Sequence, residues 1–284
     1  MNLLKKFRKI TKLSPIDAYL ASGRVPWSEG YKQYRYGLLQ ENVNNPDLLK
    51  KFSLNEELAS EYGLGIDERI VEYPWLLSRI KSDDRLVLDA GSALNYPFLL
   101  ETSQLTDKKV VIQTLAPEST MSKRANVSYI FGDLRDTLFK NDCFDLIASI
   151  STLEHIGMDN SKLYTDDNSH NQSCPDDALK VIDEIRRILK PGGRFLMTVP
   201  YGRPQNFGWL YQFDSSRLDQ IINSFGSKLS SKTFYKYTRR GWILSKQEDC
   251  ADCEYFDVHS AAEPASDLAA AARAVACLEF EKNV

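Results

Sequence analysis

Short apolar runs alternate with longer helical stretches between residues 85 and 200, and this rhythm constrains the fold more than any other feature of the chain. The runs lie at residues 86–88, 110–112, 127–131, 144–150 and 195–199. They lack an apolar–polar alternation, as expected of strands covered on both faces. Strand, crossover and strand at this spacing predict βαβ units, and therefore an α/β fold built on a parallel sheet.

The clearest helix is expected at residues 176–189, where apolar side chains form one stripe. Asp176 in the first turn and Arg186 in the last complement the helix dipole. Further on, the pattern predicts a helix at 215–225 and an alanine-rich helix at 265–274. It also predicts strands at 233–239, 241–245 and 275–281, which we expect to close the sheet as an antiparallel, hairpin-like edge.

Residues 1–80 are helical or irregular in pattern and rich in aromatic side chains. We expect this segment to be an N-terminal helical cap on a single domain formed by residues 81–284. Residues 1–13 have apolar side chains at helical spacing, with lysine and arginine on the remaining face. Such a helix could make weak contact with an anionic membrane surface, although docking on its own domain or fraying is the favoured interpretation.

The composition excludes several classes of protein. The chain has 36 basic and 39 acidic side chains and a net charge of −3, so nucleic acid is not an expected partner. Five cysteines without a secretory segment favour the reducing cytoplasm. Cys250 and Cys253 form a C-x-x-C pair without a second pair at finger-like spacing, so no metal site is expected there. The oligomeric state is left open.

Chemistry in a parallel sheet is expected beyond the carboxyl ends of the strands. The first strand leads into Asp89 and Gly91, but further glycines are missing from the turn that follows. A dinucleotide pyrophosphate needs a G-x-G-x-x-G turn, so a nicotinamide or flavin dinucleotide is disfavoured. An adenosyl ligand without a phosphate remains compatible with this loop.

Five motifs occur in order along the chain: VLDAG at 87–91, GD at 132–133, FDLI at 144–147, LEH at 153–155 and LKPGGRF at 189–195. Together they resemble the motif set of class I S-adenosylmethionine-dependent methyltransferases, in particular the branch with small-molecule, quinone and sugar acceptors. The resemblance covers roughly residues 80–200. It implies a Rossmann-like, mostly parallel sheet of about seven strands with an antiparallel last strand, and S-adenosyl-L-methionine as the cofactor.

The resemblance also implies a cofactor site, residue by residue. The loop at Gly91 would pass beneath the methionine part, with Asp89 near it, and Asp133 would accept a hydrogen bond from the adenine amino group. The expected cofactor-binding residues are Asp89, Ala90, Gly91, Ser92, Gln113, Thr114, Asp133, Leu134, Ser149 and Ser151. The chain departs from the family because the acid that holds the ribose is missing after the second strand. Gln113 or Thr114 could replace it with neutral hydrogen bonds, or Glu118 could reach back.

His155 is the candidate general base, because imidazole titrates near neutral pH. The alternative is a histidine that hydrogen-bonds a backbone carbonyl and shapes the pocket. Glu154 and His155 could also hold a divalent ion, but no third ligand is evident, so no metal is assigned. The expected acceptor-binding residues are Glu154, Tyr164, His170, Tyr201 and Arg203. The polar stretch at 158–175, together with Tyr201, Gly202, Arg203 and Trp209, would cover the acceptor as a lid, and surface hydration alone is the alternative explanation of its polarity.

The expected reaction is methyl transfer to a small-molecule or glycan acceptor such as a nucleotide sugar, at a hydroxyl group. This acceptor class rests on family analogy. No Asp-Pro-Pro-Tyr-like tetrad follows the fourth strand, which argues against base and amide nitrogens as acceptors. The alternative is a catalytically silent adenosyl-binding or scaffold protein, motivated by the missing ribose acid and the single glycine. A nucleotide-dependent oxidoreductase is a third, weaker alternative.

Overall fold

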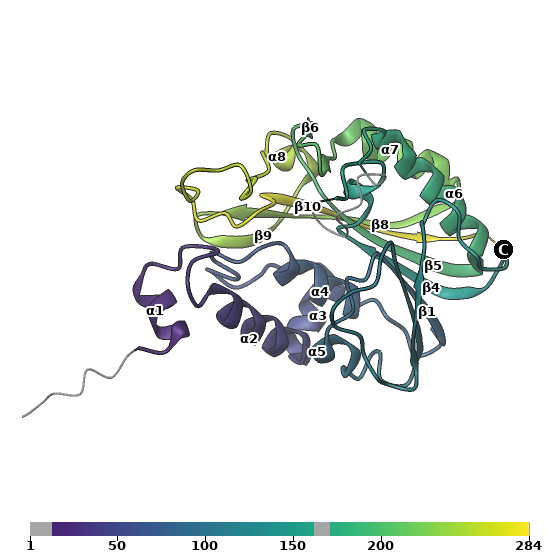
Figure 1. Ribbon diagram of the computed structural model, residues 1–284, viewed down its shortest axis with the longest axis horizontal. Helices are drawn as coiled ribbons and strands as arrows, with labels where there is room; N and C mark the ends of the chain where they lie inside the picture. The colour runs from purple at the N-terminus through teal and green to yellow at the C-terminus, as the bar shows by residue number, and fades with distance from the viewer. Residues whose placement is uncertain (1–12, 162–170, 284) are drawn as a thin grey trace, which may run out of the picture.

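The computed structural model describes residues 13–161 and 171–283, which form three layers around one central sheet (Figure 1). The N-terminal helices lie on one face of the sheet, and two later helices lie on the other. The predictions for residues 1–12, Tyr164 and His170 lie outside the described residues. No helix in the two described ranges is long and apolar enough to cross a membrane.

The sheet has eight strands in the order β3-β2-β1-β4-β5-β10-β8-β9. Their bounds are β1 Leu86–Ala90, β2 Lys109–Thr114, β3 Val127–Phe131, β4 Phe144–Ile150, β5 Leu189–Pro200, β8 Lys228–Thr238, β9 Gly241–Ser245 and β10 Ala274–Glu281. The strands from β3 to β5 are parallel, and β10 is antiparallel to both β5 and β8. The predicted Rossmann-like sheet with its antiparallel last strand is therefore confirmed, with β9 as an additional edge strand.

The strand order reverses between β1 and β4, so the carboxyl ends of these two strands meet at the switch point where ligands bind in such sheets. Gly241 adopts a φ of 84°, which allows the chain to turn back from β8 into β9. A separate two-stranded sheet, β6 (Gln205–Asn206) and β7 (Tyr211–Gln212), lies beyond the end of β5.

Two long helices cover one face of the sheet, α6 (Ala178–Ile188) and α7 (Ser215–Phe225), together with the short α8 (Gln247–Cys250). Both long helices were predicted, although residues 175–177 form the 3₁₀ turn η3 (Pro175–Asp177) in place of the first turn of α6. The Asp214 side chain caps α7 by accepting a hydrogen bond from the Arg217 amide at 2.9 Å.

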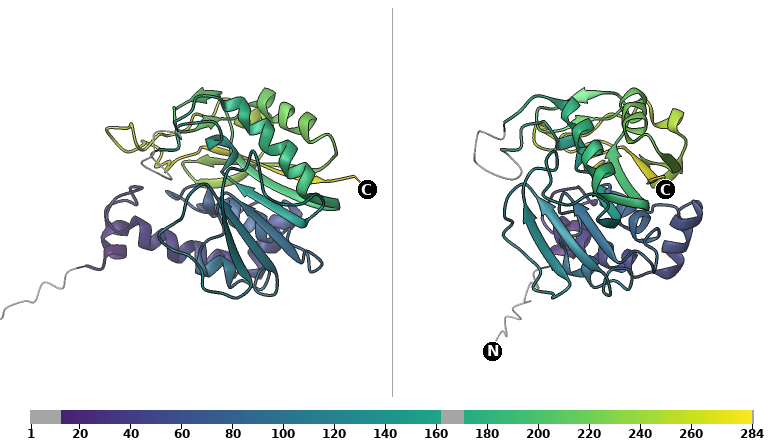
Figure 2. Two further views of the ribbon diagram at one scale, coloured as in Figure 1. Left: turned by 45° about the vertical axis from the view of Figure 1, so that its right-hand side comes forward. Right: turned by 90° about the vertical axis from the view of Figure 1, so that its right-hand side faces the viewer.

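The N-terminal helices cover the opposite face (Figure 2). They are α1 (Pro15–Ala21), α2 (Tyr31–Val43), α3 (Pro46–Leu54) and α4 (Arg69–Leu77), and α5 (Pro97–Leu100) joins them after β1. Their apolar side chains share one core with sheet residues such as Val87 and Leu196. Residues 13–80 thus supply a layer of the fold, and the domain boundary at residue 80 stays a prediction.

The predicted alanine-rich helix at 265–274 is wrong. The segment is irregular, and its backbone bonds to distant residues: the Ala270 carbonyl accepts from Trp27 Nε1 at 2.7 Å, and the Ala272 amide donates to Glu68 at 3.3 Å. The alanine side chain is small, so distant segments can approach the backbone of this stretch and hydrogen-bond to it. These tertiary hydrogen bonds outweigh the helix propensity of alanine. The crossovers at 115–126 and 132–143 also carry no helix, contrary to the βαβ rhythm.

Candidate functional site

A cleft opens at the carboxyl ends of β1, β2, β3 and β4, on the switch-point side of the sheet. Its volume is about 520 Å³ including the open mouth. It is lined by Gly91, Gln113, Thr114, Leu115, Gly132, Asp133, Leu134, Arg135, Thr152, His155, Ile156, Gly157, Asn160 and Gln172. The cleft therefore collects residues from five separate stretches of the chain, including six of the predicted site residues.

The loop after β1 is held from below by Asp89. Its fully buried carboxylate accepts hydrogen bonds from the backbone amides of Ala93 at 3.1 Å and Leu94 at 2.7 Å. Burial raises the pKa of Asp89 to about 7, although the two amides oppose the shift. Asp89 thus shapes the loop rather than lining the cleft.

Gly91 is required for contact between this loop and the segment after β4. Its φ is 122°, and a Cβ atom there would overlap the side chain of Thr152. Ser92, the next residue, also has a positive φ of 65°, and its buried hydroxyl has no partner among the described residues. The sequence predicted a close approach of Gly91 to a ligand, whereas the space that its missing Cβ leaves is filled by Thr152.

The end of β2 carries neutral side chains where the family has an acid. Gln113 donates from Nε2 to the carbonyl oxygens of Asp133 at 3.1 Å and Gly132 at 3.4 Å. Its Oε1 and the Thr114 hydroxyl are buried and have no partner among the described residues. Glu118 accepts a hydrogen bond from Asn95 at 2.8 Å and is not among the residues lining the cleft. Of the three alternatives from the sequence, Gln113 and Thr114 are the ones that the fold brings to the cleft.

Asp133 follows β3 and is held by Arg135. The guanidinium donates from Nε at 3.0 Å and from Nη2 at 2.6 Å, and it also pairs with Asp177 below the start of α6. Burial opposes ionisation of Asp133, but the hydrogen bonds from Arg135 outweigh it and lower its pKa. The carboxylate is therefore charged and fixed in direction at neutral pH.

His155 lies in η1 (Leu153–His155) after β4, with its Nδ1 2.9 Å from the carbonyl oxygen of Trp209. Because a carbonyl only accepts, Nδ1 must carry the proton, and Nε2 of the neutral ring is left with a lone pair. Burial lowers the pKa of His155 to about 4, so the ring is neutral at pH 7. Glu154 lies beside it, with Oε1 3.9 Å from His155 Nε2.

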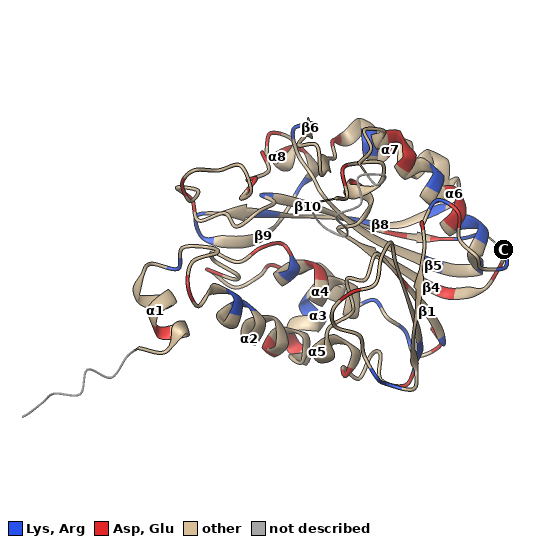
Figure 3. Ribbon diagram, viewed as in Figure 1, with Lys and Arg blue, Asp and Glu red and all other residues tan. Residues whose placement is uncertain are grey.

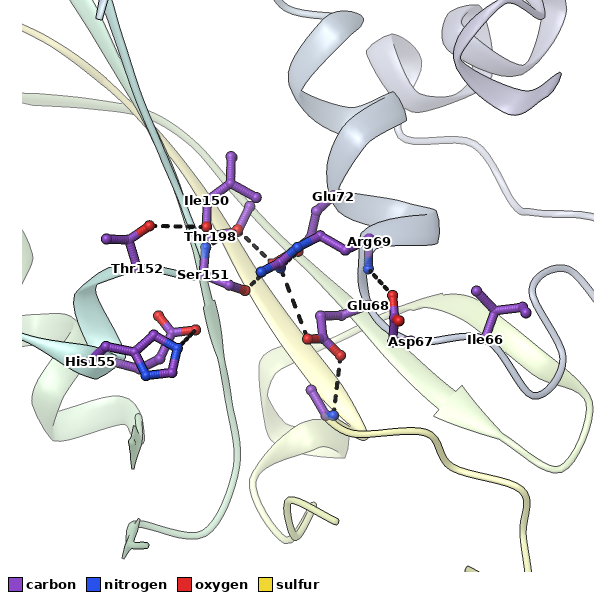
Figure 4. A network of polar contacts seen from close by, with 12 residues as sticks. Ile66, Asp67, Glu68, Arg69, Glu72, Ile150, Ser151, Thr152, His155 and Thr198 are labelled. Atoms are coloured by element: carbon purple, nitrogen blue, oxygen red, sulfur yellow. Dashed lines mark hydrogen bonds and ion pairs between the residues drawn. The ribbon is translucent and has the colours of Figure 1, made fainter. Parts of the chain in front are cut away.

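A buried polar network joins α4 to the ends of β4 and β5 (Figure 4). The Glu72 carboxylate accepts hydrogen bonds at 2.6 Å from the hydroxyls of both Ser151 and Thr198, and it pairs with Arg69. Figure 3 shows both signs of charge on α4, at the centre of the molecule. Burial raises the pKa of Glu154 well above its usual range, and Glu72 reinforces the shift. Sequence reasoning missed this network, although charges within a helix that is otherwise buried were a detectable signal.

The remaining predicted residues lie apart from the cleft wall. Ala90 and Ser149 are buried beneath it, and the Ser149 hydroxyl has no partner among the described residues. Tyr201 packs against Phe234, and its hydroxyl accepts a hydrogen bond from Gln247 at 3.2 Å. Arg203 is exposed and pairs with Glu254. Sequence reasoning did not assign Leu115, Arg135, Thr152, Ile156, Asn160 or Gln172, which also line the cleft.

No three histidine, cysteine, aspartate or glutamate side chains are grouped as metal ligands within residues 13–161 and 171–283. The buried oxygens at the cleft are Gln113 Oε1, which can accept a hydrogen bond, and Thr114 Oγ1, which can donate or accept one. Gln113, Thr114 and Asp133 together suit the hydroxyl and amino groups of an adenosine, which carries no phosphate to be neutralised.

Comparison with protein families adds one match. Residues 100–197 match the family model described as methyltransferase domain. This range contains β2, β3, β4, α6 and most of β5, and with them most of the cleft. The chain therefore carries a methyltransferase domain, with S-adenosylmethionine as its cofactor. No curated protein matches the sequence significantly.

Several solved structures are similar in part. A methyltransferase of Bacillus halodurans, described as putative, is 13% identical, with 72% of this chain and 95% of that chain covered and a TM-score of 0.46. The N-methyltransferase NodS of Bradyrhizobium japonicum is 12% identical, with 74% and 93% covered and a TM-score of 0.44. The cyclase SpnF is 14% identical, with 89% and 96% covered and a TM-score of 0.46.

Proposed function

We propose that this protein transfers the methyl group of S-adenosylmethionine to a hydroxyl group of a small-molecule acceptor, and that the acceptor is a glycan or nucleotide sugar. The observation that carries the proposal is the cleft at the sheet's switch point, where buried oxygens of Gln113 and Thr114 have no partner among the described residues. Bound there, the cofactor supplies a methyl group already activated by the sulfonium.

The residues of the cleft divide into binding and supporting roles. Gln113 Oε1 and Thr114 Oγ1 would accept hydrogen bonds from the ribose hydroxyls, and Asp133, held by Arg135, would accept one from the adenine amino group. Leu134, which lines the cleft, would pack near the adenine ring. The loop from Ala90 to Ser92 would pass beneath the methionine part, and Asp89 holds that loop through two backbone amides. Ser149 and Ser151 support the floor.

His155 is placed to remove the proton from an acceptor hydroxyl. Its Nδ1–H bond to the Trp209 carbonyl directs Nε2 away from that carbonyl, and the ring is neutral at pH 7. A neutral Nε2 with its lone pair free is the form that a general base requires. Most of the rate enhancement would come from alignment of the acceptor, which can contribute about 7 to 11 kcal/mol.

Two measurements test the proposal. Calorimetry with S-adenosylmethionine and S-adenosylhomocysteine should show binding of both, and failure of both to bind would favour a silent scaffold protein. Methyl transfer from radiolabelled S-adenosylmethionine should then be assayed on saccharides, nucleotide sugars and phenols, with products identified by mass spectrometry. We expect methyl ethers of saccharide hydroxyls, and products methylated only on nitrogen would contradict the hydroxyl assignment.

A further inference from the structure

A second pocket lies beside the cofactor cleft, behind the stacked pair of His155 and Trp209. Its volume is about 1040 Å³ including the open mouth. The two ring centroids of the pair are 5.4 Å apart with an interplanar angle of 22°; His155 lines the first cleft and Trp209 lines the second. The pocket is lined by Trp27, Lys32, Arg35, Asp67, Glu68, Arg69, Trp209, Tyr255, Val258, His259 and Ala271.

Aromatic side chains form two walls of this pocket. Trp27 is 41% exposed and is held by its Nε1 hydrogen bond to the Ala270 carbonyl at 2.7 Å. On the other wall, Trp209 contacts Tyr255 at 6.0 Å and His259 at 5.1 Å between ring centroids, both edge-on. The walls come from sequence segments far apart, so only the tertiary fold assembles them.

The floor of the pocket is formed by charged side chains, and their ion pairs and hydrogen bonds to one another leave Glu68 with weak partners. Asp67 is paired with Arg35, and Arg69 is paired with Glu72. Glu68, 8% exposed, has weaker partners: the Ala272 amide at 3.3 Å and Arg69 at 3.9 Å. Burial raises the pKa of Glu68 to about 7, and the neighbouring Asp67 adds to the shift.

Two donors of the pocket, one buried and one exposed, also lack a partner among the described residues. The Trp209 indole Nε1 is buried and makes no hydrogen bond to any described residue. No carboxylate of the described residues lies within salt-bridge distance of Lys32 at the exposed edge of the pocket. A buried donor without an acceptor is energetically unfavourable, so a ligand that supplies the acceptor would stabilise this side chain.

We infer that this second pocket binds a saccharide ring of the methyl acceptor, with Glu68 accepting hydrogen bonds from ring hydroxyls and Trp209 Nε1 donating one. The inference rests on the proposed function, which names a glycan or nucleotide sugar, and adds where its ring binds and which side chains contact it. The apolar C–H faces of a sugar ring fit against Trp27 and Trp209, while its hydroxyls supply both donors and acceptors to the floor.

The same features disfavour a planar, mostly apolar ring such as a quinone. Such a ring could stack on the aromatic walls, but it would remove water from Glu68 and Lys32 without replacing the lost hydrogen bonds. Covering a charged or polar group without giving it a new hydrogen-bond partner is strongly unfavourable. The pocket therefore selects for hydroxyl groups, not for ring planarity alone.

Fluorine NMR on protein labelled with 5-fluorotryptophan tests this inference without using activity. The chain has four tryptophans, of which Trp75 and Trp242 are fully buried and serve as internal references. Signals are assigned with single Trp→Phe variants. The probes are glucose, N-acetylglucosamine, uridine diphosphate glucose and 1,4-naphthoquinone, each added to protein saturated with S-adenosylhomocysteine.

We expect at least one of the three saccharide probes to shift the Trp27 and Trp209 signals saturably, with Trp75 and Trp242 unchanged. The variant Glu68→Gln should weaken that binding about 5- to 10-fold, and Trp27→Ala should weaken it similarly, while calorimetry shows unchanged affinity for S-adenosylhomocysteine. Trp27→Ala is the check should Glu68→Gln fail to fold, because Trp27 is partly exposed at the pocket edge.

Three results would overturn the inference: no shift with any saccharide, shifts with 1,4-naphthoquinone alone, or saccharide binding unaffected by both substitutions. Failure of the proposed function is separate, because it appears as absence of S-adenosylhomocysteine binding in calorimetry of the unmodified protein. The saccharide titration is then repeated without that ligand, and shifts of Trp27 and Trp209 would leave the pocket assignment standing.

Discussion

The Nδ1 atom of His155 lies 2.9 Å from the carbonyl oxygen of Trp209, and the two rings stack between the cofactor cleft and the second pocket. The hydrogen bond sets the tautomer of His155, and the stacking sets the plane of its ring. Both contacts depend on the segment after β5, 54 residues further along the chain. The position of the candidate base is thus set by the same residue, through its backbone carbonyl and its ring, that lines the proposed acceptor pocket.

Replacement of His155 by asparagine should separate its two roles. Asparagine can keep a donor to the Trp209 carbonyl but has no equivalent of Nε2, so kcat should fall about 10²- to 10⁴-fold. Affinity for S-adenosylhomocysteine, measured by calorimetry, should change less than about 2-fold. An unchanged kcat would show that His155 only shapes the pocket.

The stability of the protein should depend on pH through His155. Its pKa is about 4 in the folded chain against 6.5 in the unfolded chain, so between these values the unfolded state binds more protons. The stabilisation is complete above pH 6.5 and is lost as the pH falls toward 4. Urea denaturation at pH 7.5 and 4.5 should show the wild type losing on the order of 2 kcal/mol relative to His155→Asn. A pH-independent difference would contradict the buried neutral ring.

Two glycines of the cleft should differ in their tolerance of alanine. Gly91→Ala meets Thr152 at a φ of 122° and should cost about 2 to 5 kcal/mol in the free energy of unfolding. Gly132→Ala has open space around it and should cost less than about 0.5 kcal/mol. Adding Thr152→Gly to Gly91→Ala should restore part of the loss, because it removes the overlap and leaves only backbone strain. No recovery would mean that the overlap is not the cause.

Restoring the family's acid at the end of β2 should not improve cofactor binding. In Gln113→Glu the new carboxylate faces the carbonyl oxygens of Gly132 and Asp133, which now receive hydrogen bonds from the amide. We expect affinity for S-adenosylhomocysteine to fall about 10-fold, corresponding to about 1.4 kcal/mol. Thr114→Val, which removes only one hydroxyl, is the matched comparison. Tighter binding by Gln113→Glu would refute this account of the missing acid.

Removal of the Glu72 charge should destabilise the protein strongly. Glu72 is fully buried and Arg69 is only partly exposed, so Glu72→Gln leaves Arg69 without its direct partner, and loss of one partner of a buried pair typically costs about 3 to 5 kcal/mol. The double variant Arg69→Met with Glu72→Gln should be more stable than the sum of the two single effects predicts. Glu184→Gln, which breaks the more exposed pair with Arg187, should cost no more than about 1 kcal/mol. Equal losses in the free energy of unfolding for Glu72→Gln and Glu184→Gln would show that burial of the Glu72 network adds no stability.

The strands from β1 to β5, β10 and the helices α6 and α7 were predictable because their side chains report burial through local periodicity. The loop at Gly91, the acid Asp133 and the base candidate His155 came from the resemblance of their motifs to those of methyltransferases, and the fold brings all three residues to one cleft. By contrast, the arrangement of Trp27, Glu68 and Trp209 around one pocket has no local signature.

The order of apolar runs and turns along the chain by itself determined a mostly parallel sheet with its polar groups at the carboxyl ends of the strands. Tertiary structure alone decided that residues 265–274 are not helical, that Gln113 lines the cleft while Glu118 bonds Asn95, and that Trp209 orients His155. The physical reason is the separation of the interacting residues along the sequence. Periodicity is local and indicates which face of an element is buried, whereas hydrogen bonds and ring contacts between distant segments depend on how those segments pack together.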